Sequence, residues 1–190
     1  GDYRMDSTEN ELIQQAAAGN RQAFGALVQR HQARVFQFIR RLHGSTNEAG
    51  DLTQETFIKA YQALPRWRPE ARFHTWLLQI ARNTTLDALR QRRRRPEDTL
   101  EEHAQLADPG PSPLQHLESG RRLALLEQLL ARLPLEQREI LLLREVEGLS
   151  YTELAAALGI NSGTVKSRLA RAREAMLISY QQTNEGYPHD

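Results

Sequence analysis

The chain has 190 residues and a mass of 21.7 kDa, enough for one or two small domains. Hydrophobic residues make up 39% and charged residues 26%, a composition typical of folded, soluble proteins. The absence of cysteine excludes disulfides, thiolate metal sites and cysteine nucleophiles. No stretch reaches the roughly 20 apolar residues of a membrane span, and the N-terminus lacks the apolar core of a signal peptide. We therefore expect a cytoplasmic protein without direct membrane contact.

The net charge of +1 conceals an uneven distribution along the chain. Residues 1–95 carry 16 Lys and Arg against nine Asp and Glu, whereas residues 96–120 carry six acids and no Lys or Arg. Residues 121–190 carry nine of each, but four of the bases gather within residues 160–180. Two basic segments thus flank an acidic one. Basic surfaces attract nucleic acid, although an ordinary solvated helix face explains such charges as well.

Apolar residues recur at helical spacing along most of the chain, and strand alternation is nearly missing. We predict helices over residues 9–18, 20–42, 47–64, 73–95, 114–133, 134–146, 151–158 and 162–177. The polar tail after residue 180 is expected to fray. Residues 96–113 combine several prolines with acidic residues and lose the apolar period, which indicates a linker. The predicted fold is all-α, with two small helical domains (1–95 and 114–190) joined by a flexible acidic linker.

A helix-turn-helix is the strongest local signal, and it lies within residues 148–169. Ser150 and Glu153 have the spacing of a capping box, which marks a helix start. Gly159 falls where a tight turn between two helices needs a positive φ. A second helix then begins near Ser162, and this layout is the one that places a helix in the DNA major groove. The alternative is a generic helical hairpin with a basic solvent face.

The exposed face of that second helix is the candidate base-reading surface. Side chains that reach base edges need hydrogen-bonding or small apolar groups, and one helix face presents only a few of them. We expect base-edge contacts from Lys166, Ser167, Ala170 and Arg171. Phosphate or structural contacts are expected from Thr164, Arg168 and Arg173.

A second candidate surface combines aromatic and basic residues. Five of the twelve aromatic residues lie within residues 57–76, among several arginines. Single-stranded nucleic acid needs this combination, because bases stack on aromatic rings while cations neutralise phosphates. Helical spacing makes Phe57, Phe73 and Trp76 better candidates for the core. Trp67, between two arginines in a predicted loop, is less easily assigned there.

Three blocks of sequence carry a family resemblance. They are DLTQETFIKAYQAL (51–64), FHTWLLQIARNTTLDALR (73–90) and LPLEQREILLLREVEGLSYTELAAALGINSGTVKSRLARARE (133–174), with the proline-rich linker before the last. In this order they resemble the extracytoplasmic-function (ECF) family of bacterial RNA polymerase sigma factors. The resemblance covers nearly the whole chain and is far more specific than a lone helix-turn-helix.

The resemblance implies a role for each segment. The helix with Asp51, Gln54, Glu55 and Ile58 is expected to dock on the β′ clamp helices of core RNA polymerase. The loop with Arg66, Trp67, Arg68 and Arg72 is expected to capture a flipped base of the −10 element. The helix after it is expected to read −10 DNA through Asn83, Thr84, Asp87 and Arg90. The helix-turn-helix would bind the −35 element, and the linker would thread through the polymerase.

Further partners follow from the same resemblance. They are core RNA polymerase (β′ and β subunits), promoter DNA and an anti-sigma factor, which in this family is often membrane-anchored. Lys166 and Ala170 depart from residues common in relatives, so the −35 preference stays open. No catalytic residue, metal site or cofactor is expected, because no nucleophile–base spacing, ligand cluster or phosphate loop is present. A free-standing DNA-binding regulator is the alternative, but it would leave residues 51–76 without a purpose.

Overall fold

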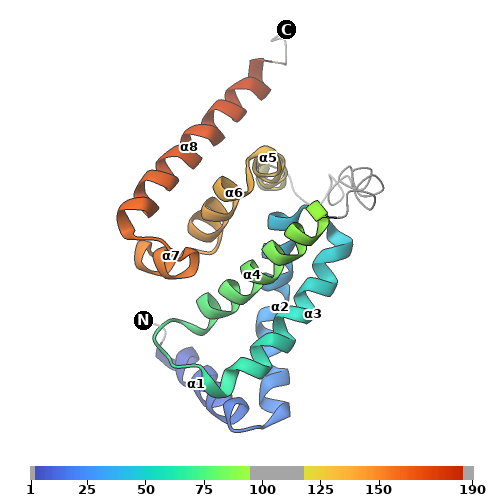
Figure 1. Ribbon diagram of the computed structural model, residues 1–190, viewed down its shortest axis with the longest axis vertical. Helices are drawn as coiled ribbons and strands as arrows, with labels where there is room; N and C mark the ends of the chain where they lie inside the picture. Colours follow the sequence, from blue (N-terminus) through green and yellow to red (C-terminus); the bar gives the residue numbers. More distant parts are fainter. Residues whose placement is uncertain (1–2, 95–117, 186–190) are drawn as a thin grey trace. The chain divides into compact units, whose positions relative to one another are not determined.

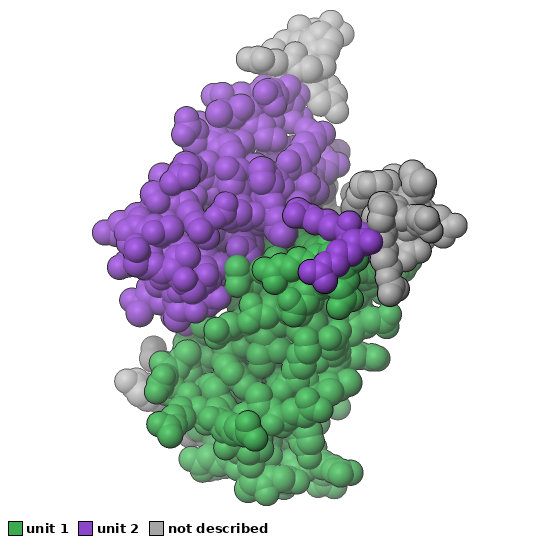
Figure 2. All heavy atoms as spheres, viewed as in Figure 1, with its two compact units in different colours: residues 1–91 green, residues 92–190 purple. Residues whose placement is uncertain are grey.

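The computed structural model describes residues 3–94 and 118–185, and every regular element in these ranges is a helix (Figure 1). This confirms the predicted all-α fold. The chain divides into two compact units, residues 1–91 and 92–190, coloured separately in Figure 2. The predicted linker, 96–113, lies outside the described residues. None of the helices described is long and apolar enough to cross a bilayer.

Unit 1 contains four long helices. They are α1 (Tyr3–Ala17), α2 (Arg21–His43), α3 (Thr46–Ala63) and α4 (Phe73–Arg94), with a short 3-10 turn, η1 (Leu64–Arg66), after α3. As predicted, Asn20 caps α2, its side chain accepting a hydrogen bond from the Ala23 amide. Gly44 ends α2 in the left-handed conformation with φ +92°, and Ser45 then caps α3. Helix α1 begins six residues earlier than the predicted Glu9.

The core of unit 1 is built mainly from α2, α3 and α4. Val35, Ile39 and Leu42 of α2 are fully enclosed, as are Leu77 and Leu78 of α4. The three side chains of α2 lie four and three residues apart, and Phe73, Leu77 and Ala81 of α4 lie four residues apart, so each helix turns an apolar stripe inward. The opposite faces of α3 and α4 are thereby left to solvent, and they carry the residues considered below.

Unit 2 is formed by α5 (Glu118–Arg132), α6 (Leu135–Leu141), a π-helical turn η3 (Leu142–Val146), α7 (Tyr151–Leu158) and α8 (Ser162–Glu185). Two expectations were wrong. The predicted helix 134–146 changes to a π-helix at Leu142. The helix predicted to end at residue 177 continues to Glu185, where α5 packs against α8 and Arg132 donates a hydrogen bond to Thr183; the rest of the polar tail, 186–190, lies outside the described residues. Contacts with α5 thus stabilise the helix in a polar segment for which the sequence pattern predicts none.

His31 joins three helices of unit 1. It lies on α2, is 7% exposed, and pairs through Nε2 with the Glu9 carboxylate of α1. Its ring packs edge-on against Phe73 and stacks on His74 of α4, with centroids 5.3 and 5.7 Å away. Burial lowers the pKa of His31 below 6.5 and outweighs the opposing hydrogen bond to Glu9, with smaller lowering effects from His74 and Arg34. This residue is therefore a packing residue whose neutral form the fold favours.

The lowered pKa predicts that unit 1 loses stability as pH falls below 6.5. The unfolded chain then binds a proton at residue 31 more readily than the folded chain, so the free energy of unfolding declines through that window. Urea unfolding at pH 7.5 and 5.5 measures this, followed by tryptophan fluorescence, because both tryptophans, Trp67 and Trp76, lie in unit 1. His31→Gln should flatten the pH dependence. An equal pH dependence in both proteins would contradict the assignment.

Candidate nucleic-acid interface

Local hydrogen bonds fix the start of α7 and the start of α8. The amide of Ser150 donates to Glu153 Oε1 and the amide of Glu153 donates to Ser150 Oγ, each at 3.1 Å, which completes the predicted capping box. Gly159 ends α7 with φ +66°, the left-handed conformation expected for this position. Asn161 then caps α8, accepting from the Thr164 amide at 2.8 Å. The local sequence had not singled out this cap.

Apolar packing decides which side of α8 faces outward. Val165, Leu169 and Ala172 of α8 are at most 1% exposed, and Leu154 of α7 is fully buried. Ala157 is the buried small residue of α7, whereas Ala155 is only half-buried. The residues predicted to reach base edges, Lys166, Ser167, Ala170 and Arg171, are all exposed. The structure therefore brings them together on one side of α8.

The other three residues predicted on α8 are held by contacts within unit 2. Thr164 bonds to Asn161 through both its amide and its hydroxyl. Arg168 pairs with Glu136 of α6 at 3.0 Å. Arg173 donates from Nε and Nη2 to Glu145 Oε1 at 3.2 and 2.8 Å. Of the two alternatives left open for them, these contacts favour the structural one.

The π-helical turn connects this hairpin to α6. Arg144 lies over the ring of Tyr151, 4.9 Å from its centroid, and donates from Nη1 to the carbonyl of Leu149 at 2.7 Å. The same turn carries Glu145, the partner of Arg173. A π-helical turn is uncommon and recurs at functional sites. Here it places two charged residues beside the start of α7 and the middle of α8.

The predicted polymerase-docking residues share one face of α3. Gln54 and Glu55 lie three and four residues after Asp51, and Ile58 lies three residues after Glu55; all four are exposed. The exposed fraction of Ile58 is 58%, which is high for a large apolar side chain. An apolar side chain bordered by acidic and amide groups has the makeup of a partner-binding surface with a polar rim.

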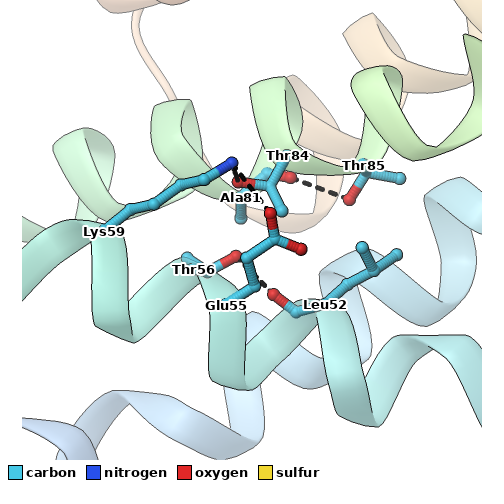
Figure 3. Close-up of polar contacts among 7 residues, drawn as sticks. All are labelled: Leu52, Glu55, Thr56, Lys59, Ala81, Thr84 and Thr85. Atoms are coloured by element: carbon cyan, nitrogen blue, oxygen red, sulfur yellow. Dashed lines mark hydrogen bonds and ion pairs between the residues drawn. The ribbon is translucent and has the colours of Figure 1, made fainter.

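Lys59 connects this face to α4 (Figure 3). Its Nζ lies 3.1 Å from Glu55 Oε1 and 3.2 Å from Thr84 Oγ1. Thr84, predicted to touch −10 DNA, is only 2% exposed. A buried hydroxyl that accepts from a lysine on the neighbouring helix is not available to DNA in this fold, so we remove Thr84 from the candidate contacts.

The remaining −10 candidates divide between a loop and one face of α4. Arg66, Arg68 and Arg72 are exposed, as are Asn83, Asp87 and Arg90. Asp87 and Arg90 form an exposed pair at 3.4 Å. Trp67 is half-buried, with its ring centroid 5.8 Å from that of Phe73 and 5.5 Å from that of Trp76. The ring thus extends an aromatic cluster and leaves only part of its surface to a ligand.

Comparison with known proteins relates both units to one family. Residues 27–95 match Sigma-70 region 2, and residues 123–176 match Sigma-70, region 4. The chain is 38% identical over 177 residues to the RNA polymerase sigma-H factor of Pseudomonas aeruginosa, covering 88% of this chain and 91% of that protein. It is 37% identical over 175 residues to the ECF RNA polymerase sigma-E factor of Haemophilus influenzae, covering 88% and 92%.

Solved structures give the same relation. The structure of CnrH in complex with the cytosolic domain of CnrY matches with a TM-score of 0.67 and 28% identity, covering 92% of this chain and 97% of that one. The sigma factor RpoE in complex with the anti-sigma factor NepR, from Bartonella quintana, matches with a TM-score of 0.69 and 27% identity, covering 83% and 96%.

The Lys59 contacts predict a coupled stability effect. Lys59→Met keeps much of the aliphatic stem but leaves Thr84 without its lysine donor, so we expect a loss of about 1 kcal/mol in the free energy of unfolding. Thr84→Val is the matched partner change. The double variant should lose less than the sum of the two single variants, which urea unfolding can measure. Strict additivity would show that the contact contributes nothing.

Proposed function

The chain belongs to the family of ECF RNA polymerase sigma factors, and on that premise we propose that it is an alternative promoter-specificity subunit of bacterial RNA polymerase. The observation that carries the proposal is that the similarity spans both units rather than the helix-turn-helix alone. A protein that merely binds duplex DNA has no need of unit 1. Its action is to direct core polymerase to a set of promoters and to begin strand opening, without catalysing a reaction itself.

Unit 1 is proposed to bind the polymerase and the −10 element on different helices. The exposed face Asp51, Gln54, Glu55 and Ile58 would dock on the β′ clamp helices, with Ile58 as its apolar centre. The loop 66–72 and the exposed side of α4 would meet single-stranded −10 DNA. Flipping a base costs a few kcal/mol of unstacking, which contacts to the flipped base must offset. Asn83 suits a base edge, because an amide both donates and accepts.

The −35 element is proposed to meet the exposed side of α8 in unit 2. Arg171 and Lys166 can donate to guanine in the major groove, Ser167 can donate or accept, and Ala170 offers an apolar contact to a thymine methyl. The hydroxyl of Ser167 donates to the Thr164 carbonyl at 3.1 Å and keeps its acceptor capacity for a base. These four residues lie next to one another on one exposed side of α8, as contact with neighbouring bases requires.

Regulation is proposed to come from a protein partner. RpoE was solved bound to an anti-sigma factor, and a similar partner is proposed to hold this chain inactive. The acidic segment 96–113 would enter the polymerase channels, where its negative charge suits a path built for RNA. The proposed location is the cytoplasm, where core polymerase acts.

In vitro transcription tests the function directly. Fragmented genomic DNA is transcribed by bacterial core polymerase with and without the protein, and the transcripts are sequenced. We expect start sites that occur only with the protein, each preceded by a shared pair of elements. Tight duplex binding by the protein alone, with no stimulation of transcription, would instead support the free-standing regulator.

The docking face makes a prediction about the affinity for core polymerase, measured by a binding titration with the purified enzyme. Asp51→Lys with Glu55→Lys should weaken binding to core polymerase about tenfold or more, because reversal replaces attraction by repulsion at the interface. Glu11→Lys, an exposed reversal on α1, is the control and should bind normally. Circular dichroism checks that helicity is retained. Unchanged affinity of the double variant would reject the docking assignment.

Arg171 makes a prediction about the −35 element. Arg171→Ala should cost roughly 1–3 kcal/mol on the preferred −35 sequence and relax discrimination at one base pair, if the guanidinium reads a base edge. Promoter binding by the holoenzyme, measured on single-base variants of a promoter found above, provides the readout. A uniform loss across all variants would make Arg171 a phosphate contact.

A further inference from the structure

Two acid–arginine pairs hold α8 from different parts of unit 2. Arg168 is paired with Glu136 in the first turn of α6, and Arg173 is paired with Glu145 in the π-helical turn. Glu136 and Glu145 thus lie at opposite ends of the segment formed by α6 and η3. The hydrogen bond to Glu145, and to a smaller extent that to Tyr151, raises the pKa of Arg173, so these contacts stabilise the charged guanidinium.

The positions of these arginines around α8 are informative. A helix turns by about 100° per residue, so Arg168 and Arg173 lie on opposite flanks, roughly 130° and 90° from the middle of the exposed face that holds Lys166, Ser167, Ala170 and Arg171. Val165, Leu169 and Ala172 line the buried side between the two flanks. Neither arginine therefore shares the centre of the base-reading face. Both stand at its edges, where a contact restrains rotation of the helix.

Near the π-helical turn, apolar packing alone restrains that rotation weakly, and the contact of α5 with α8 lies further along the helix, near Thr183. The buried stripe ends in Ala172, whose methyl group interlocks with its neighbours far less than a larger side chain does. Rotation about the helix axis would move every base-reading side chain at once. Each pair is weak by itself, because the side chains of Arg173 and Glu145 are 49% and 51% exposed. Acting from opposite flanks, the two pairs resist rotation in both directions.

We propose that Glu136 and Glu145 are positioning residues that set −35 specificity: through Arg168 and Arg173 they fix the rotation of α8 and so decide which side chains face the bases. The proposal rests on the proposed function of this helix and adds two specificity-determining acids that never touch DNA. It also turns Arg168 and Arg173 from DNA contacts into internal partners of those acids.

The competing explanation makes the opposite prediction for one variant. If Arg173 binds a DNA phosphate and Glu145 merely competes for it, Glu145→Gln frees the arginine and raises affinity for every promoter. If Glu145 positions α8, the same variant lowers discrimination between the preferred −35 element and its single-base variants. We expect a two- to fivefold loss of discrimination, about what an exposed ion pair can supply.

The experiment uses the full protein in complex with core polymerase. Promoter DNA is the strongest genomic promoter found by transcription, with each −35 base changed in turn. Four proteins are compared with the wild type: Glu145→Gln, Arg173→Gln, both changes together, and the swap Glu145→Arg with Arg173→Glu. The double neutral variant keeps the net charge, so a loss of discrimination in it cannot come from charge alone. Thermal unfolding of each variant checks the fold.

The swapped variant, Glu145→Arg with Arg173→Glu, distinguishes the two explanations. Restored discrimination with a reversed pair supports positioning, since a glutamate at 173 would repel a phosphate. A further sign is an unchanged slope of affinity against salt in Arg173→Gln, because a lost phosphate contact lowers that slope by about one. No rescue by the swap, a lowered slope, or full discrimination in every variant overturns the proposal. Failure of the wild type to stimulate transcription would reject the proposed function instead.

Discussion

The packing of α8 on α7 and α6 determines what the rest of unit 2 can do. Because Val165, Leu169 and Ala172 are buried, the residues between them in sequence must face solvent or the flanks. The capping box at Ser150 and the left-handed Gly159 set where α7 begins and ends. Local hydrogen bonds thus fix the bounds of α7, the apolar stripe fixes the side of α8 that is buried, and two ion pairs contact α8 on its flanks.

In unit 1, buried threonine hydroxyls form their hydrogen bonds within their own helices. Thr53, Thr56 and Thr85 are buried, and each donates its hydroxyl proton to the backbone carbonyl four residues earlier, as Figure 3 shows for Thr56 and Thr85. Such bonds satisfy a polar group without a partner from another helix. Helices α3 and α4 can therefore bury these threonines on their inward sides, while their outer faces remain exposed. Lys59 is the side chain that joins one of these faces to the other helix.

Sequence patterns were most informative where the determinant is local. The caps at Asn20 and Ser150, the positive φ at Gly159 and the apolar stripes all depend on residues within one turn of each other. The π-helical turn could not be read from sequence, because residues 140–143 form an apolar run compatible with either helix type. The length of α8, the burial of Thr84 and the pairing of Arg168 and Arg173 all depend on side chains more than 20 residues away, which periodicity does not report.

The separation of the exposed face of α8 from its buried stripe has an evolutionary consequence. No residue belongs to both sets, so substitutions at 166, 167, 170 and 171 leave the core untouched. Surface changes of this kind usually alter stability by less than about 0.5 kcal/mol. Given the −35 contacts proposed for these residues, a lineage that duplicates this gene can change the promoters that one copy recognises without crossing the stability threshold that removes most core mutations. The packing of α8 thus lets duplicated copies come to recognise different promoters while both stay folded.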